Sequence, residues 1–274
     1  MGTGLAELLD PVRLYLRYVS LSFQSQMQYR ASLVMLSIAH FFSSVTEFLG
    51  TVALFGRFGT LQGWTLPEVA LFYGMVHVAF SLSESGARGF DLVHLYVQSG
   101  SFDRMLLRPR STVLQVLGQD FQLLRVGRFT QGMFFLLWGV SKLGITWTPG
   151  KFLLALLAIL GGAALFSGLF VLQATLSFWS VEGLEIANIL TYGGAETAQF
   201  PLSIYRNWLR EFFIFIVPLA SINYFPALRI LGRADPLGYP SWVACLSPAV
   251  GVGFFLVCLQ VWNFGVRHYH STGS

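Results

Sequence analysis

Long apolar stretches separated by short polar intervals dominate the pattern of hydrophobic and polar positions along this chain. Each stretch is close to the length of about 20 residues that a helix needs to cross a bilayer. The pattern therefore predicts an all-α, polytopic membrane protein with six transmembrane helices. We expect these spans at about residues 31–55, 67–85, 128–145, 151–179, 208–227 and 241–265.

Residues 1–30 precede the first apolar stretch and have a different periodicity. Apolar residues recur every three or four positions from Leu5 to Phe23, while charged residues such as Arg13 and Arg17 occupy the other face. This pattern is typical of an amphipathic helix in the membrane interface, with arginine side chains reaching lipid phosphates. A soluble helix packed on a partner has the same pattern and remains the alternative.

The longest polar interval, residues 86–127, contains a short segment with mixed apolar and charged residues at helical spacing. The positions concerned are Phe102, Asp103, Arg104, Met105, Leu106 and Arg108. A Gly-Ser start and Pro109 at the end predict a short amphipathic helix over about 101–109. Because this segment is too short to fold alone and too polar to cross a bilayer, we expect a docking helix that binds another protein.

A second unusual interval joins the fifth and sixth predicted spans. Between Tyr224 and Trp242 the chain is largely apolar but is interrupted by Pro226, Pro236 and Pro240. Backbone groups that proline leaves unpaired must be satisfied by protein or water. We therefore expect an external re-entrant hairpin of two short helices, with a simple exposed loop as the alternative.

Composition supports the membrane assignment, because 54% of the residues are hydrophobic and only 11% are charged. Soluble domains usually carry about 25% charged residues. The net charge of +4 is therefore better explained by membrane topology than by nucleic-acid binding. With the predicted spans, twelve Lys and Arg residues lie on the side of both termini and the docking helix, and five lie on the other side. Arg206 and Arg210 are among the twelve. This count predicts that the termini and the docking helix are cytoplasmic.

Catalytic and metal-binding motifs are absent from the sequence, so no catalytic residue, metal ligand or cofactor is assigned to the chain. It also lacks the G-x-x-x-x-G-K-[ST] motif that cradles nucleotide phosphates, so a nucleotide-driven process would need a separate ATPase chain. Glu47 and His77 lie at similar predicted depth in the first two spans, where ionisable groups are costly and usually pair. They are candidates for an intramembrane polar site, although a structural hydrogen bond explains them equally simply.

Several stretches resemble permeases of the ABC-2 family, most closely the branch of about 260–270 residues that is partnered by a separate ATPase. The most specific of these stretches extends from Ser99 to Pro109. The others are Gly63–Glu68, Tyr224–Ala227 and Gly265–Tyr269. The resemblance covers nearly the whole chain, as an N-terminal interface helix over 1–30 followed by an ABC-2 type transmembrane domain over 31–274.

The resemblance implies a permease subunit of an ABC exporter in the bacterial cytoplasmic (inner) membrane. It further implies a dimer of ATP-binding subunits, which would hold ATP and Mg, and a second permease that is identical or homologous. The docking helix would then couple the ATPase to the spans, with Phe102, Met105 and Leu106 entering a groove and Arg104 and Arg108 pairing with acidic groups. The substrate is not indicated. A stand-alone secondary transporter or channel is the alternative, although it would need more intramembrane charges and an internal repeat.

Overall fold

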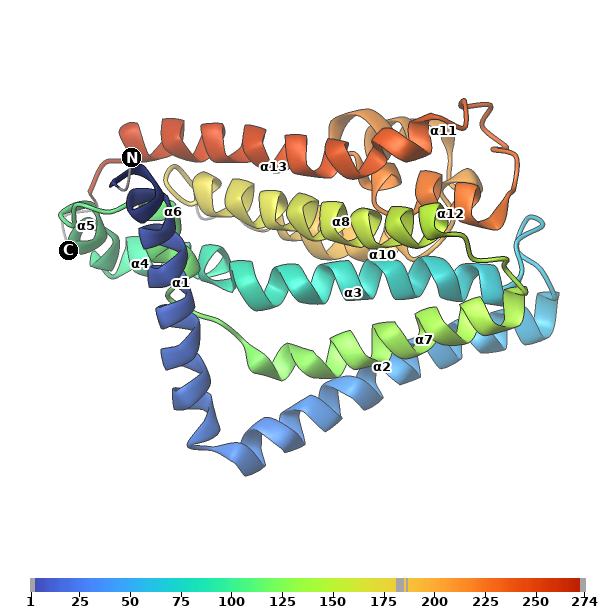
Figure 1. The fold of residues 1–274 in the computed structure, drawn as a ribbon, viewed down its shortest axis with the longest axis horizontal. Helices are drawn as coiled ribbons and strands as arrows, with labels where there is room; N and C mark the ends of the chain where they lie inside the picture. The colour runs from blue at the N-terminus through green and yellow to red at the C-terminus, as the bar shows by residue number, and fades with distance from the viewer. Residues whose placement is uncertain (1–2, 181–184, 186, 272–274) are drawn as a thin grey trace.

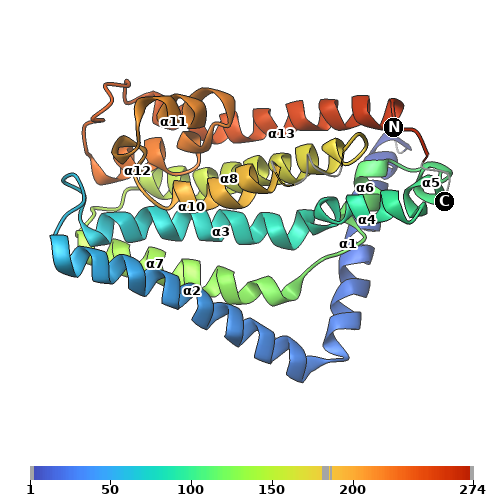
Figure 2. The same ribbon diagram turned by 180° about the vertical axis from the view of Figure 1, so that it is seen from behind.

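Helix α3 (Leu66–Asp91) lies at the centre of the computed structural model, which describes residues 3–180, 185 and 187–271. It packs against α7 (Val126–Leu143) on one side and α8 (Pro149–Leu176) on the other. Helix α2 (Arg30–Phe58) covers α7, and α13 (Val243–Arg267) covers α8 (Figures 1 and 2). Residues 69–81 of α3 are all buried, as expected for a helix that is apolar on every side.

The starts of α3 and α8 each carry a threonine cap. The Glu68 carboxylate accepts a hydrogen bond of 2.7 Å from the Thr65 backbone N–H, as in a capping box. Thr148 accepts from the backbone N–H of Lys151 at 3.3 Å, and Pro149 occupies the first turn of α8. These local signals fix where two of the central helices begin.

The helical bundle has two distinct ends (Figure 1). The terminal end contains the start of α1 (Thr3–Met27), the last turn of α13 and the short helices α4 (Val93–Gln98), α5 (Ser101–Leu106) and α6 (Thr112–Leu117). The loop end contains the connections 59–65, 144–148 and 232–242. Both chain termini and the Arg-rich interval therefore share one end, as the positive-charge count requires.

Helix α1 runs across the terminal end, at a steep angle to α3 (Figures 1 and 2). Within α1, side chains are described from Arg13 onward, so the part of the predicted apolar face from Leu5 to Val12 lies outside the described side chains. Leu16 and Phe23 are exposed, whereas Tyr18 packs beside Gly118. One face thus holds the bundle, and apolar side chains remain available to a membrane interface.

Four helices of the described chain are long and apolar enough to cross a membrane, or five if a bent pair counts as one span. The four are 30–58, 66–98, 149–176 and 243–267. The bent pair joins 207–216 to 219–231 at an angle of 75°. Helix α7, the predicted third span, lies alongside α3 but is not among the four.

The chain between α8 and α13 differs most from the sequence-based expectation. It was expected to stay at the terminal end as far as residue 207 and then to cross as a fifth span. Instead, η2 (Ile189–Gly193) and α10 (Gly194–Ala198) lie along the bundle, and η3 (Leu202–Ile204) reaches the loop end, where Trp64 donates to Ser203 at 3.0 Å. Polar residues of this segment enter the bundle, because Thr191 and Gln199 are buried with hydrogen-bond partners.

Helices α11 (Asn207–Glu211), η4 (Phe212–Ile216), η5 (Leu219–Ser221) and α12 (Tyr224–Leu231) therefore gather at the loop end. The expected hairpin over 224–242 is replaced by the bent pair, because helical structure ends at Leu231 and residues 232–242 contain no helix. Arg206 and Arg210 consequently lie at the loop end. The count of Lys and Arg residues is then ten at the terminal end and seven at the loop end.

Candidate functional site: a polar network and the α5 helix

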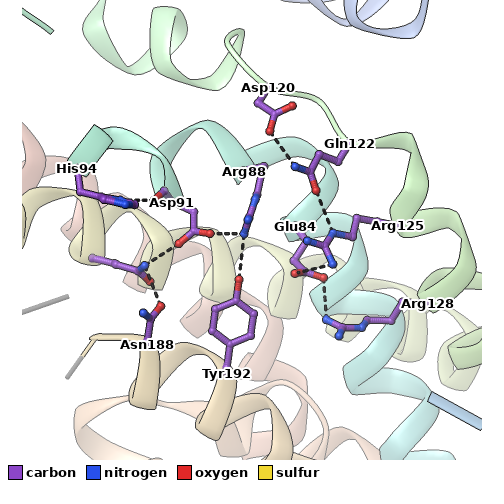
Figure 3. Close-up of polar contacts among 11 residues, drawn as sticks. Glu84, Arg88, Asp91, His94, Asp120, Gln122, Arg125, Arg128, Asn188 and Tyr192 are labelled. Carbon is purple, nitrogen blue, oxygen red and sulfur yellow. Dashed lines mark hydrogen bonds and ion pairs between the residues drawn. The ribbon is translucent and has the colours of Figure 1, made fainter. Parts of the chain in front are cut away.

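The inner face of α3 at the terminal end carries three charged residues at helical spacing. Glu84, Arg88 and Asp91 stand four and three positions apart, which places them on one face of the helix. Two sets of side chains converge on this face, from the start of α7 and from the segment that follows α8 (Figure 3). Together they form a polar network where the apolar bundle meets the short helices.

Glu84 is only 1% exposed and is neutralised by two arginines. Its Oε2 accepts from Arg128 Nη1 at 2.7 Å, and its Oε1 lies 3.4 Å from Arg125 Nη1. A carboxylate buried to this extent requires such partners, because an unpaired buried charge is costly. Arg125, in η1 (Leu123–Arg125), also donates to Gln122 Oε1 at 3.1 Å. The pairings tie the last turns of α3 to the start of α7.

Arg88 and Asp91 continue the network toward α8. Arg88 pairs with Asp91 and also donates to the Tyr192 hydroxyl at 3.1 Å. The Asp91 carboxylate accepts from Gln173 Nε2 of α8 at 2.6 Å, and the same nitrogen lies 2.9 Å from Asn188 Oδ1. Tyr192 belongs to the π-helical turn η2, a rare element that is frequent at functional sites. This half of the network holds α3, α8 and η2 together.

Helix α5, the predicted docking helix, is anchored to the bundle by its aromatic side. Phe102 is fully buried, with ring centroids 5.1 Å from Phe178, 6.0 Å from Trp262 and 5.2 Å from Tyr269. Burial and the nearby Asp103 carboxylate raise the pKa of the Tyr269 phenol to about 12, so this ring of the C-terminal segment packs as a neutral group. Ser271 donates to Asp103 at 2.6 Å. The C-terminal segment therefore holds α5 in place.

The outer side of α5 carries the exposed residues. Leu107 is 85% exposed and Leu106 38% exposed, and Arg104 and Arg108 are exposed beside them. Helical structure ends at Leu106, three residues earlier than predicted, and Gln115 donates to the Met105 carbonyl at 3.0 Å.

Three residues of the predicted docking helix are placed differently from the expectation. Phe102 and Met105 were expected to enter a groove on a partner, but both are buried within this chain. The outward apolar residue that helical spacing did not single out is Leu107. Asp103 is half-buried and is bound by the C-terminal segment rather than facing outward.

Glu47 and His77 do not form the pair that their predicted depth suggested. Glu47 is exposed on α2. His77 is 5% exposed on α3 and stacks on Tyr73 with ring centroids 4.0 Å apart, and neither of its ring nitrogens has a hydrogen-bond partner among the described residues. Glu47 instead lies within electrostatic range of Tyr73 and of Glu196 in α10.

Sequence reasoning did not identify the network as a unit, although the spacing of Glu84, Arg88 and Asp91 was a usable signal. Gln173, a polar residue inside the apolar stretch of the fourth predicted span, is also a member. Its partners Asn188 and Tyr192 lie in the segment that was expected outside the bundle. No group of three or more potential metal ligands occurs within the described residues.

Comparison with known protein families gives one match over most of the chain. The family model described as ABC-2 family transporter protein matches residues 41–273. No curated protein and no solved structure matches the chain. The match includes the whole polar network, α5 and both ends of the bundle.

Proposed function

The chain belongs to the ABC-2 transporter family, and from this premise we propose that it is the permease subunit of an ABC exporter. ATP and Mg would be bound by a separate dimer of ATP-binding subunits. A second permease, identical or homologous, would complete the pathway for an unidentified substrate. The chain itself would carry out no chemical reaction, because its role is to change conformation when the ATPase closes.

The exposed side of α5 is the observation that carries this proposal. Leu106 and Leu107 project beside Arg104 and Arg108 from the end of a helix whose opposite side is fixed to α13 and to Phe178, which follows α8. An apolar pair flanked by cations suits a groove with an acidic rim, which is helix-in-groove recognition. The anchoring by Phe102 means that a force on α5 is passed to the spans rather than lost in a loose segment.

A physical route leads from α5 to the polar network. Gln115 of α6 bonds the end of α5, and the backbone of Val116 in α6 lies so close to Gly89 that a Cβ there would be 1.8 Å from the Val116 carbonyl oxygen. Gly89 stands between Arg88 and Asp91 on α3. Displacement of α5 would therefore press on α3 where it contacts α8 and η2, and would shift the balance between inward- and outward-facing states.

This assignment also sets the orientation in a bacterial inner membrane. The ATPase works in the cytoplasm, so the terminal end with both termini would be cytoplasmic and the loop end external. The excess of Lys and Arg at the terminal end, ten against seven, agrees with this orientation.

Glu47 and Glu196 fit a place along the translocation path. Both are exposed, on α2 and α10 respectively, and both belong to segments that run along the bundle. Carboxylates within a membrane face a bundle interior or water rather than lipid. In a pair of permeases this side of α2 and α10 would therefore face the second subunit or a water-filled path between the two.

Co-purification tests the proposal. The tagged chain, expressed in its natural host and extracted in mild detergent, should retain a P-loop ATPase identifiable by mass spectrometry. Vesicles that contain the complex should hydrolyse ATP faster than the ATPase alone. Absence of any P-loop protein, together with ion-gradient-driven flux by the chain alone, would instead establish a secondary transporter.

A further inference from the structure

A cavity of about 890 Å³ opens at the loop end, far from the polar network and from α5. Its walls come from the first turns of α8 and α13, the outer side of α12 and the connection 232–241. The apolar part of the lining includes Leu154, Phe225, Leu228 and Ala244. Lys151 and Arg229 supply positive charge to the same cavity.

These two cations are not compensated within the protein. Neither the Lys151 nor the Arg229 side chain has a hydrogen-bond or ion-pair partner among the described residues. The third lining cation, Arg233, is already engaged: it pairs with Glu68 at 2.8 Å and lies over the Trp64 ring at 4.0 Å. Two unpaired positive charges therefore face a cavity with an apolar wall.

The single lining carboxylate does not neutralise them. Asp235 accepts hydrogen bonds from the Tyr224 hydroxyl at 2.6 Å and from the backbone N–H groups of Leu237 and Tyr239 at 3.0 and 3.2 Å. These bonds shape the loop and occupy the carboxylate. The N-terminal ends of α8 and α13 also meet here, and each contributes positive potential from its helix dipole.

We propose that this cavity binds a phosphate-bearing amphiphile, with its anionic headgroup at Lys151 and Arg229 and its acyl chain along the apolar wall. A phospholipid and a free phosphate ester share the headgroup chemistry. The apolar part of the lining favours the phospholipid, since a water-soluble phosphate ester leaves it unfilled. The site is separate from the ATPase-docking surface, so it stands whether or not the proposed transport function holds.

The test uses the purified full-length chain in a neutral detergent, with short-chain phosphatidylglycerol, the matching phosphatidylcholine and glycerol phosphate as three separate probes. Binding is measured by native mass spectrometry and by the shift in melting temperature. Phosphatidylglycerol should bind more tightly than the other two. The double variant Lys151→Gln/Arg229→Gln should weaken its binding by about 10- to 30-fold, as expected for two cations that contact a headgroup.

Matched controls separate a defined site from general attraction. Lys142→Gln/Arg206→Gln removes the same charge from the same end of the bundle but from outside the cavity, and should bind phosphatidylglycerol as the unaltered protein does. Ser241→Trp keeps both cations and narrows the cavity, and should weaken binding. An unchanged melting temperature without lipid shows that each variant is folded.

Three results would overturn the inference. The first is equal weakening by both double variants, which would indicate unspecific attraction. The second is equal binding of phosphatidylglycerol and phosphatidylcholine. The third is binding of glycerol phosphate as tight as that of the lipid, which would mean that the apolar wall contributes nothing.

Discussion

Individual charged residues determine which helices of this protein pack against one another. Glu84 is buried in the most central helix and is matched by Arg128, a residue 44 positions away, while Arg88 reaches Tyr192 across 104 positions. Such pairs contribute less to stability than their Coulomb attraction suggests, because both partners lose hydration. Their effect is specific: they define which face of α3 meets α7 and which meets η2.

Removal of the Glu84 charge should therefore be costly, because it leaves two buried or half-buried arginines without their anion. We expect Glu84→Gln to lower the free energy of unfolding by about 3 kcal/mol, measured by denaturant unfolding in detergent. The double variant Glu84→Gln/Arg128→Gln should lose less than the sum of the single losses.

The control for this prediction is Asp120→Asn, which removes a charge at the solvent-facing end of the network, where Asp120 accepts from Gln122 at 2.8 Å. It should cost less than about 1 kcal/mol. Equal losses for Glu84→Gln and Asp120→Asn, or strict additivity in the double variant, would show that Glu84 and the arginines are not coupled.

At the scale of residues, the sequence predicted which residues belong to a helix better than it predicted where their side chains point. It placed Phe102 and Met105 in a helix correctly but could not show that both point inward, because their partners Phe178, Trp262 and Tyr269 are distant in sequence. Periodicity defines an apolar face without saying whether that face meets the same chain or another one. Glu47 and His77 do not pair for a similar reason: equal depth on two helices does not place side chains on facing sides.

Secondary-structure elements could be predicted where length and capping dominate. Capping residues mark where the helices after Thr65 and Thr148 begin, and the ABC-2 family match agrees with the resemblance seen in the sequence. The segment 185–231 could not be read in the same way. Its buried polar residues have hydrogen-bond partners within the bundle. In addition, Arg206 and Arg210 resemble the positively charged residues that flank the cytoplasmic end of a membrane span.

Cysteine labelling distinguishes the two arrangements of this segment. In a background with Cys245→Ser and Cys258→Ser, single cysteines replace Asn207, Ser241 and His270, all of which are exposed. A membrane-impermeant maleimide added to intact cells should label positions 207 and 241 and should reach position 270 only after lysis. The reason is that α11 lies at the loop end together with residue 241.

If position 207 is protected in intact cells while position 241 is labelled, α11 lies on the same side as the termini. The count of Lys and Arg by predicted spans placed it there. Labelling of position 270 before lysis would invert the proposed orientation of the whole protein. Cell integrity is checked with a known cytoplasmic thiol protein, which must stay unlabelled.

On the scale of the whole molecule, the two ends of the bundle differ in structure. The terminal end combines an exposed apolar pair on α5, a rigid aromatic anchor beneath it and a polar network that joins four helical segments. The loop end combines a bent helix pair with a basic cavity. The central helices α3 and α8 connect the two ends, so movement at α5 can reach the loop end without a flexible link.

The most direct test of this account is the ATP hydrolysis rate of the ATPase complex reconstituted in vesicles with Leu106→Asp/Leu107→Asp. A carboxylate forced into an apolar groove without a partner should lower stimulation by the permease at least about tenfold, while the permease keeps its melting temperature. Phe58→Asp, an equally exposed change at the loop end, should leave stimulation intact. Normal stimulation in the Leu106→Asp/Leu107→Asp variant would contradict the proposal that α5 couples the ATPase to the membrane helices.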